Sequence, residues 1–289
     1  MNFGVILPNF GPGASRMDLL DTALAAERLG FDSGWLTDHL ALPQQDAERY
    51  GHIFEVLTTM GYLAASTQRL RLGISALVLP QRNPLEVGKQ LTTLDVLSGG
   101  RVMVAAGVGW SEGEYRNLGK DFSNRGERMD EAIRLLRTLW RGGRVISFRG
   151  KHYPFEKVVF SPGPVQSGGP TLWVAGESDR ALRRAVNLGD GWHPNARSPQ
   201  ILREKLEKVA PMLAGRPFTV SLRMRVAVNR PPKTERTLAG SPDEVADQLR
   251  AYQQAGMNYA VIAFEAANQG ERERAMRLFA EKVAPQLRG

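Results

Sequence analysis

The sequence predicts an α/β protein built as a (β/α)8, or TIM, barrel. Short apolar segments that are typical of buried strands alternate about eight times with longer segments of helical periodicity. The chain has 289 residues. A barrel of this kind takes about 250, which leaves room for a modest insertion. We therefore expect a single domain over residues 1–289, with an insertion at about 142–169 between the fourth helix and the fifth strand.

The strands are predicted from short apolar runs that are bounded by glycine, proline or polar residues. Strands of a parallel barrel are covered on both faces, so runs without strict alternation of apolar and polar residues suit them. They are expected at residues 3–7, 35–37, 72–79, 102–106, 171–175, 191–193, 219–228 and 259–264.

The helices are predicted from apolar residues that recur three and four positions apart. Their ends carry typical signals. Gly30 follows the first helix, Pro84 opens the third, and the segment 241–244 fits a capping box. The helices are expected at residues 18–29, 54–65, 84–97, 128–140, 178–188, 201–213, from 242 onward, and 271–287.

The insertion at about 142–169 has a pattern of its own. Residues 145–148 and 152–155 are predicted to form a hairpin. Prolines and glycines between 162 and 169 indicate irregular chain. We interpret this segment as an extension of the barrel domain rather than as a second domain.

The composition excludes several kinds of site. The chain has no cysteine, which excludes disulfides and thiolate chemistry. Its four histidines lie far apart, without the spacing of metal ligands, so no metal site is expected. No apolar run reaches the roughly 18 residues that cross a membrane, and the N-terminus lacks a basic leader and a long apolar stretch. We expect a cytoplasmic protein with no membrane partner.

The formal net charge of +8 suits nucleic acid, an anionic cofactor or an anionic substrate. The arginines are spread over many predicted helices, and no basic block is interleaved with aromatic residues. Solvated helix faces explain this distribution better, so no nucleic-acid partner is expected.

Polar residues follow the predicted strands at the end where a barrel places its active site. Asp38 and His39 follow the second strand and open a loop of about a dozen residues. An imidazole in this place can transfer a proton or stabilise charge, although a histidine that caps the loop is the alternative. After the fourth strand, Gly107 and Gly109 allow close backbone approach and Glu112 adds a carboxylate. A tight turn would explain these glycines without a ligand.

Two later strands also end in polar residues. Gly176 and Ser178 open the helix after the fifth strand, where free N–H groups suit a phosphate or the serine simply caps the helix. Arg223 and Arg225 share one face of the seventh strand, where apolar residues are the norm. They either line a ligand pocket or pair with internal carboxylates, and we favour the structural ion pair. Two tryptophans beside strand ends are candidates for pocket walls: Trp110 and Trp192.

Several short motifs follow one another along the chain. They include Gly4-Val5-Ile6-Leu7-Pro8, Thr37-Asp38-His39, Leu72-Gly73-Ile74-Ser75, Pro80-x-Arg82-Asn83-Pro84, Gly107-Val108-Gly109-Trp110 and Gly189-Asp190-Gly191-Trp192. In this order they resemble the bacterial-luciferase-like flavin and deazaflavin oxidoreductases, over nearly the whole chain. The details are similar to the branch of that family that uses the deazaflavin coenzyme F420.

The resemblance implies a luciferase-like barrel that binds F420, or alternatively FMN, at the carboxyl ends of its strands. It implies His39 and Glu112 as catalytic residues, and a non-prolyl cis peptide at Ser75–Ala76 behind the cofactor ring. A small-molecule substrate near Trp110 and His193 and a homodimer are also implied. The residues implied to bind the cofactor are Asp38, His39, Ser75, Ala76, Val78, Gly107, Gly109, Trp110, Gly176 and Ser178.

The chain departs from the family pattern in two places. The sugar-phosphate dehydrogenases of this family carry an acidic residue after the first strand, where this chain has Phe10-Gly11-Pro12-Gly13. Their lysines for the sugar phosphate have no evident counterpart here. Glucose 6-phosphate is therefore not expected as the substrate.

The leading hypothesis is an F420-dependent oxidoreductase that transfers a hydride between the deazaflavin and a small organic substrate. The first alternative is an FMN-dependent luciferase-like monooxygenase, because a flavin activates dioxygen and a deazaflavin does not readily do so. The second alternative is a non-catalytic cofactor-binding barrel.

Overall fold

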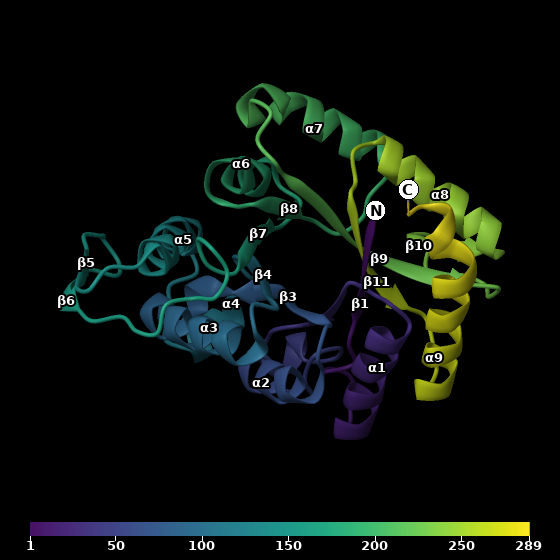
Figure 1. Cartoon of the computed structure of the whole chain (residues 1–289), viewed down its shortest axis with the longest axis horizontal. Helices are drawn as coiled ribbons and strands as arrows, with labels where there is room; N and C mark the ends of the chain where they lie inside the picture. The colour runs from purple at the N-terminus through teal and green to yellow at the C-terminus, as the bar shows by residue number, and fades with distance from the viewer. Residues whose placement is uncertain (289) are drawn as a thin grey trace.

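The computed structural model describes residues 1–288 and contains a closed barrel of parallel strands with helices around it (Figure 1). The barrel strands are β1 (Asn2–Ile6), β2 (Ser33–Leu36), β3 (Arg71–Val78), β4 (Val102–Gly107), β7 (Thr171–Ala175), β8 (Gly191–His193), β9 (Thr219–Val228) and β11 (Tyr259–Phe264). They follow chain order around the ring, and pairing of β11 with β1 completes the closure. This confirms the predicted (β/α)8 fold.

Helices connect successive strands on the outside of the barrel. The longer ones are α1 (Arg16–Arg28), α2 (Val56–Ser66), α3 (Pro84–Ser98), α5 (Arg125–Arg141), α6 (Asp179–Leu188), α7 (Pro199–Leu213), α8 (Pro242–Gln254) and α9 (Gln269–Leu278). The shorter helical segments are α4 (Glu112–Asn117), η1 (Gln44–Asp46), η2 (Leu79–Gln81), η3 (Phe279–Val283) and η4 (Ala284–Gln286). Within residues 1–288, no helix is both long and apolar enough to cross a membrane.

The helix ends follow the sequence signals. Pro84 occupies the first turn of α3, and Gly99 ends that helix in the left-handed conformation, with a φ of 69°. Ser241 and Glu244 form the capping box of α8. The last helix is less regular than expected, since α9 passes into the π-helical η3 and the 3-10 turn η4. Pro285 lies in η4 and lacks the N–H that a regular helix requires.

The insertion contains an antiparallel hairpin, which extends away from the barrel at the left of Figure 1. Its strands are β5 (Ile146–Phe148) and β6 (Phe155–Val158). The second strand begins where the predicted strand at 152–155 ends. The reason is Glu131 of α5, whose carboxylate accepts the backbone N–H groups of residues 151–153 at 2.7–2.9 Å. The N–H groups of that backbone are therefore bound by a side chain and do not pair in a sheet.

A strand that the sequence pattern did not indicate, β10 (Thr237–Gly240), pairs in parallel with the outer end of β9. β9 is ten residues long and extends well beyond its pairing with the short β8, which ends at Val220 on the same edge. The free edge of β9 accepts the short segment just before α8. A four-residue run of this kind carries almost no signal in the sequence, because its partner and not its composition makes it a strand.

The inside of the barrel is filled below the strand ends. A cluster that includes Trp35, Trp173 and Tyr259 occupies it. The rings of the two tryptophans stack with centroids 5.0 Å apart, and Tyr259 meets Trp173 edge-on at the same centroid distance. A side chain at Gly4 or at Gly73 would overlap the indole of Trp35, so close packing requires glycine at both positions. This cluster closes the barrel interior from below and supports the residues of the cavity described next.

Candidate active site

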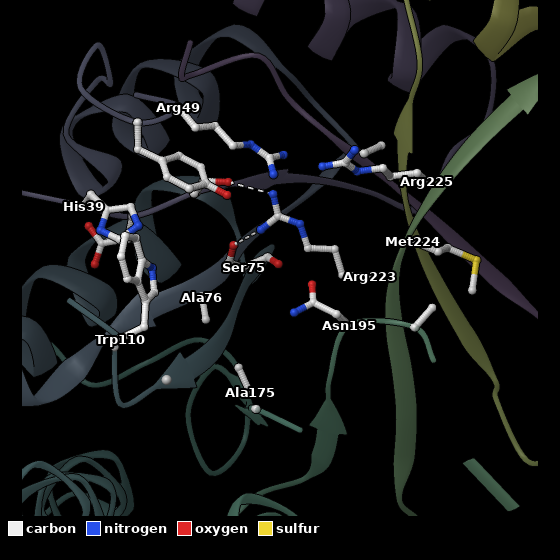
Figure 2. Close-up of a pocket in the computed structure, with 18 of the residues that line it drawn as sticks. His39, Arg49, Ser75, Ala76, Trp110, Ala175, Asn195, Arg223, Met224 and Arg225 are labelled. Carbon is white, nitrogen blue, oxygen red and sulfur yellow. Dashed lines mark hydrogen bonds between the residues drawn. The ribbon is translucent and has the colours of Figure 1, made fainter. Parts of the chain in front are cut away.

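A cavity of about 820 Å³ opens at the carboxyl ends of the barrel strands. Its lining comes from the carboxyl-terminal parts of β3, β4, β7, β9 and β11 and from the segments that follow β2, β4, β7, β8 and β9 (Figure 2). Of the residues expected to bind cofactor or substrate, those that line the cavity are Asp38, His39, Ser75, Ala76, Val78, Gly107, Gly109, Trp110 and Gly176. Three further residues do not line it: Glu112, Ser178 and His193.

His39 and a buried glutamate form a hydrogen-bonded pair at the cavity wall. Nδ1 of His39 lies 3.0 Å from Oε2 of Glu114, and both side chains are almost fully buried. The same carboxylate accepts the N–H groups of Leu40 and Ala41 at 2.7 and 3.2 Å, and Nε2 of Gln81 at 3.1 Å. Burial raises the pKa of Glu114, but these hydrogen bonds outweigh it, that from His39 first, and lower the pKa to about 2.

The pair fixes the orientation of the imidazole. An ionised carboxylate only accepts hydrogen bonds, so Nδ1 of His39 carries the hydrogen that it donates to Glu114. Nε2 is the nitrogen left for a ligand in the cavity, which His39 lines. Tyr50 and Trp110 flank the ring, with centroids 4.9 and 5.7 Å from that of His39. This arrangement of a carboxylate, a histidine and an open nitrogen is typical of proton transfer.

The geometry moves the acid/base candidate from Glu112 to Glu114. Glu112 is exposed in the first turn of α4, outside the cavity lining. Ser111 caps α4 by accepting the N–H of Glu114 at 3.1 Å, which turns the chain so that Glu114 faces His39. The spacing Ser111-x-x-Glu114 matches a capping box and is the signal that would have located the helix start and this carboxylate.

Asp38 connects the loop after β2 to the end of β3. Its carboxylate accepts the N–H of Val78 at 2.9 Å and pairs with Arg82 at 2.7 Å. Arg82 also pairs with Glu55 at 3.1 Å. These contacts hold the segment that carries His39 against β3, so Asp38 positions the histidine beside it.

The wall beside His39 is built from small residues. The Ser75–Ala76 peptide is cis, as the resemblance implied, and the pairing register of β3 with β4 shifts between Ser75 and Leu77. A side chain at Gly107 would lie 3.2 Å from Cβ of Ala76 and 3.7 Å from Cβ of Ala175. These residues therefore form a flat surface with no long side chain on it, and a planar ring can lie against such a surface.

His193 supports this wall from below and does not face the cavity as expected. Its Nε2 lies 2.8 Å from Oγ of Ser75, and its Nδ1 lies 2.9 Å from Oγ of Ser221. The ring stacks on Trp35 with an interplanar angle of 13°. Burial, and then the charge of Arg223, lower the pKa of His193 to about 3. The imidazole is thus neutral, and its hydrogen bond holds the side chain of Ser75 in position.

Only one of the two residues expected to bind the cofactor phosphate, Gly176 and Ser178, lines the cavity. Gly176 lines the cavity with a φ of 125°, a conformation that favours glycine. Its carbonyl accepts the indole N–H of Trp192 at 2.8 Å. Trp192 is buried and anchors this turn, so it is not a wall of the cavity. Ser178 is exposed, and its hydroxyl accepts the N–H of Ala181 at 3.2 Å as the cap of α6.

The arginines of β9 face the cavity, and the expected internal ion pairs are not formed. Arg223 and Arg225 both line the cavity, and within residues 1–288 neither forms an ion pair with a carboxylate. Arg223 donates from Nη1 to the carbonyl of Ser75 at 2.8 Å and from Nη2 to Oγ1 of Thr37 at 3.3 Å. The sequence had also not singled out Arg49, although it lies in the long loop after β2 that suggested function.

The fold and the cavity define a barrel enzyme with its site at the carboxyl ends of the strands, the arrangement of the luciferase-like oxidoreductases. A sequence profile of the luciferase-like monooxygenase family matches residues 1–236, and the chain belongs to that family. This confirms the resemblance read from the motifs.

Individual relatives extend the comparison. The chain is 27% identical over 341 aligned residues to the F420-dependent glucose-6-phosphate dehydrogenase of Nocardia farcinica, and the alignment covers 100% of this chain and 98% of that protein. It is 30% identical over 225 residues to the phthiodiolone/phenolphthiodiolone dimycocerosates ketoreductase of Mycobacterium sp. strain JLS, covering 70% of this chain and 57% of that protein.

Solved structures share the fold. A monooxygenase from Streptomyces bottropensis superposes with a TM-score of 0.86 at 21% identity, covering 100% of both chains. An F420-dependent secondary alcohol dehydrogenase in complex with an F420-acetone adduct superposes with a TM-score of 0.84 at 19% identity, covering 100% of this chain and 99% of that one. At these identities the likeness establishes the barrel and its topology.

Proposed function

We propose that this chain is an F420-dependent oxidoreductase that transfers a hydride between the deazaflavin and a small organic substrate. The observation that carries the proposal is the buried His39–Glu114 pair beside a flat wall of small residues in one cavity. A relative with similarity over the whole chain is an F420-dependent dehydrogenase, which supports the choice of cofactor. The alternative with FMN is kept as an outcome of the test.

The residues of the cavity fit a tricyclic cofactor. Ala76, Gly107 and Ala175 would contact the face of the ring, because all three line the cavity and none has a side chain longer than a methyl group. Gly176, at the end of β7, leaves the backbone accessible to the phosphate of the side arm. The volume of about 820 Å³ lies in the usual range of cofactor and ligand sites.

When bound, the deazaflavin supplies or accepts the hydride at its ring carbon. The chain's own residues provide position and proton transfer. Glu114 orients His39 through Nδ1, which leaves Nε2 of His39 to hold or move the proton at the substrate oxygen. His193 and Arg223 hold Ser75 from two sides, which keeps the wall behind the ring in place.

Parallel titrations of the purified chain with F420 and with FMN test the proposal. We expect F420 to bind at least tenfold more tightly, a difference of about 1.4 kcal/mol or more. Equal or tighter binding of FMN would instead support the FMN-dependent monooxygenase. Stoichiometric F420 binding without turnover of any alcohol or ketone would support the non-catalytic barrel.

A matched pair of variants tests which wall holds the ring. Ala76→Leu fills the flat surface beside Gly107 and should weaken F420 binding at least 100-fold. Ala263→Leu adds the same side chain at the end of β11, elsewhere in the cavity lining, and should leave F420 affinity within threefold. Equal losses in both variants would contradict the assignment of the ring to this wall.

A further inference from the structure

The cavity gathers arginines on one side. Arg49 comes from the loop after β2, Arg223 and Arg225 from β9, and Arg236 from the segment before β10. Figure 2 shows the guanidinium groups of Arg49 and Arg225 pointing toward one another, with that of Arg223 beside them. In the same view Ala76 and Ala175 lie on the other side of the cavity.

Carboxylates do not neutralise these arginines. The cavity lining contains Asp38 and Glu235 as its acidic residues. Asp38 is already paired with Arg82, and Glu235 forms no ion pair among residues 1–288. Burial lowers the pKa of Arg223 most; Tyr50 acts in the opposite direction, and the positive charges of Arg49 and Arg225 lower the pKa further. The cluster is therefore a concentration of uncompensated positive charge that an anion would stabilise.

Two of these side chains, those of Arg49 and Arg223, are held in place by other residues of the chain. Arg49 lies over the rings of Phe10 and Tyr50, with its Cζ 5.5 and 5.1 Å from their centroids. Arg223 is fixed by its hydrogen bonds to Ser75 and Thr37. Because such groups lose little rotamer freedom on binding, the cluster is suited to an anion that accepts several N–H groups at once.

We propose that the substrate carries an anionic group, a carboxylate or phosphate, that docks between Arg49 and Arg225, with Arg223 beneath it. The proposal rests on the proposed function and deepens it, because it names the substrate class of the same cavity. Arginine forks bind carboxylate and phosphate oxygens in pairs. The rest of the substrate would extend from this cluster toward His39 and the wall at Ala76, which line the same cavity.

Direct binding of inorganic phosphate to the cofactor-free chain tests the cluster. Equilibrium dialysis with radiolabelled phosphate at low ionic strength should give saturable binding of one phosphate per chain. Arg225→Met and Arg49→Met should each weaken this binding at least tenfold. Arg49 is exposed, so its variant keeps the test valid even if the β9 variant folds poorly, which thermal unfolding would reveal.

Arg203→Met is the matched control, because it removes the same charge from an exposed position on α7 outside the cavity. We expect phosphate affinity to stay within twofold of the wild type in this variant. Non-saturable binding in the wild type, or an equal loss in the Arg203 variant, would overturn the proposal, since long-range charge would then explain the data.

The anionic tail of F420 is the other source of this chemistry, and a second arm separates the two. Phosphate dialysis is repeated with F420 bound, and F420 affinity of Arg225→Met is measured by deazaflavin fluorescence. We expect phosphate to bind to the wild type alongside F420, and the F420 affinity of Arg225→Met to stay within threefold of the wild type. Displacement of phosphate by F420, together with a tenfold loss of F420 affinity, would assign the cluster to the cofactor tail. Failure of the wild type to bind F420 would refute the proposed function alone, because the cofactor-free dialysis is independent of it.

Discussion

Replacement of Glu114 by glutamine tests the pair that orients His39. The carboxylate of Glu114 accepts from His39, Leu40, Ala41 and Gln81. A glutamine has one acceptor oxygen and one NH2 group, which only donates. On one side of the amide, the NH2 group must therefore face groups that also donate. If the oxygen stays on the backbone N–H groups, the NH2 faces His39, and the imidazole hydrogen moves from Nδ1 to Nε2.

The size of the effect follows from the charge state of Glu114. The pKa falls from an ordinary 4.5 to about 2. Because one pKa unit corresponds to 1.36 kcal/mol, the surroundings favour the ionised carboxylate by on the order of 3 kcal/mol. Glu114 is 1% exposed, so water screens little of this. We expect Glu114→Gln to lower the free energy of unfolding by roughly 2–3 kcal/mol and turnover by about 100-fold, as for loss of a positioned acid or base.

Urea unfolding and steady-state turnover measure the two effects, and Glu112→Gln is the matched control. Glu112 undergoes the same chemical change in the same helix, but it is exposed and does not line the cavity. In this control, the free energy of unfolding should stay within about 0.5 kcal/mol of the wild type, and turnover should stay within twofold of it. A large loss of turnover in Glu112→Gln, with Glu114→Gln still active, would refute the reasoning and return the acid/base role to Glu112.

The pH dependence gives an independent check on Glu114. A carboxylate whose pKa is lowered on folding contributes stability that is full above pH 4.5 and is lost as the pH falls toward 2. Between pH 7 and pH 3, the difference in free energy of unfolding between the wild type and Glu114→Gln should shrink by about 2 kcal/mol. Comparison of the two proteins cancels the contribution of other groups. An advantage that stays constant down to pH 3 would contradict the lowered pKa.

Three other substitutions have defined outcomes. His39→Ala should lower turnover by roughly 100-fold or more and change F420 affinity less than threefold; near-normal turnover would leave His39 a purely structural role. Gly73→Ala should destabilise the chain by about 1–3 kcal/mol in urea unfolding, because its side chain would overlap Trp35, whereas Gly61→Ala, whose side chain meets Leu94 at 3.6 Å, should not. His193→Leu should lower the free energy of unfolding by about 1–3 kcal/mol through the unpaired hydroxyl of Ser75. The wild type should lose stability as the pH falls below 6.5 toward 3, because His193 takes up a proton on unfolding, and the leucine variant should lack this loss. A wild type and a leucine variant with parallel pH profiles would show that His193 is not buried as a neutral ring.

The strands and helices could be predicted because local patterns determine them. The last barrel strand, Tyr259–Phe264, has the bounds expected from its apolar run. The capping box at Ser241 located the start of α8. Where a long-range partner decides the structure, the pattern failed. β10 exists because β9 extends past the short β8, and β6 is displaced because Glu131 binds the backbone N–H groups before it.

The site was predicted at the level of segments better than at the level of side chains. The strand ends with His39, Ala76 and Gly107 do converge on one cavity, since the barrel topology alone requires it. Which carboxylate reaches His39 depends on the rotation of a short helix, and a difference of two residues separates the exposed Glu112 from the buried Glu114. The sequence contains the capping signal for that rotation but not the distance to His39.

Arg223 explains why polar residues occur inside this barrel, where apolar ones are the norm. Its guanidinium binds the carbonyl of Ser75, 148 positions away in the chain, while His193 binds the hydroxyl of the same serine from below. The peptide that forms the wall is thus held by a charged group that also belongs to the arginine cluster of the cavity. A leucine at 223 would pack equally well in a strand, but it would leave the carbonyl of Ser75 without this donor and the cluster with less charge. The requirement for arginine at this position therefore comes from the site, and the cluster and the wall depend on one side chain.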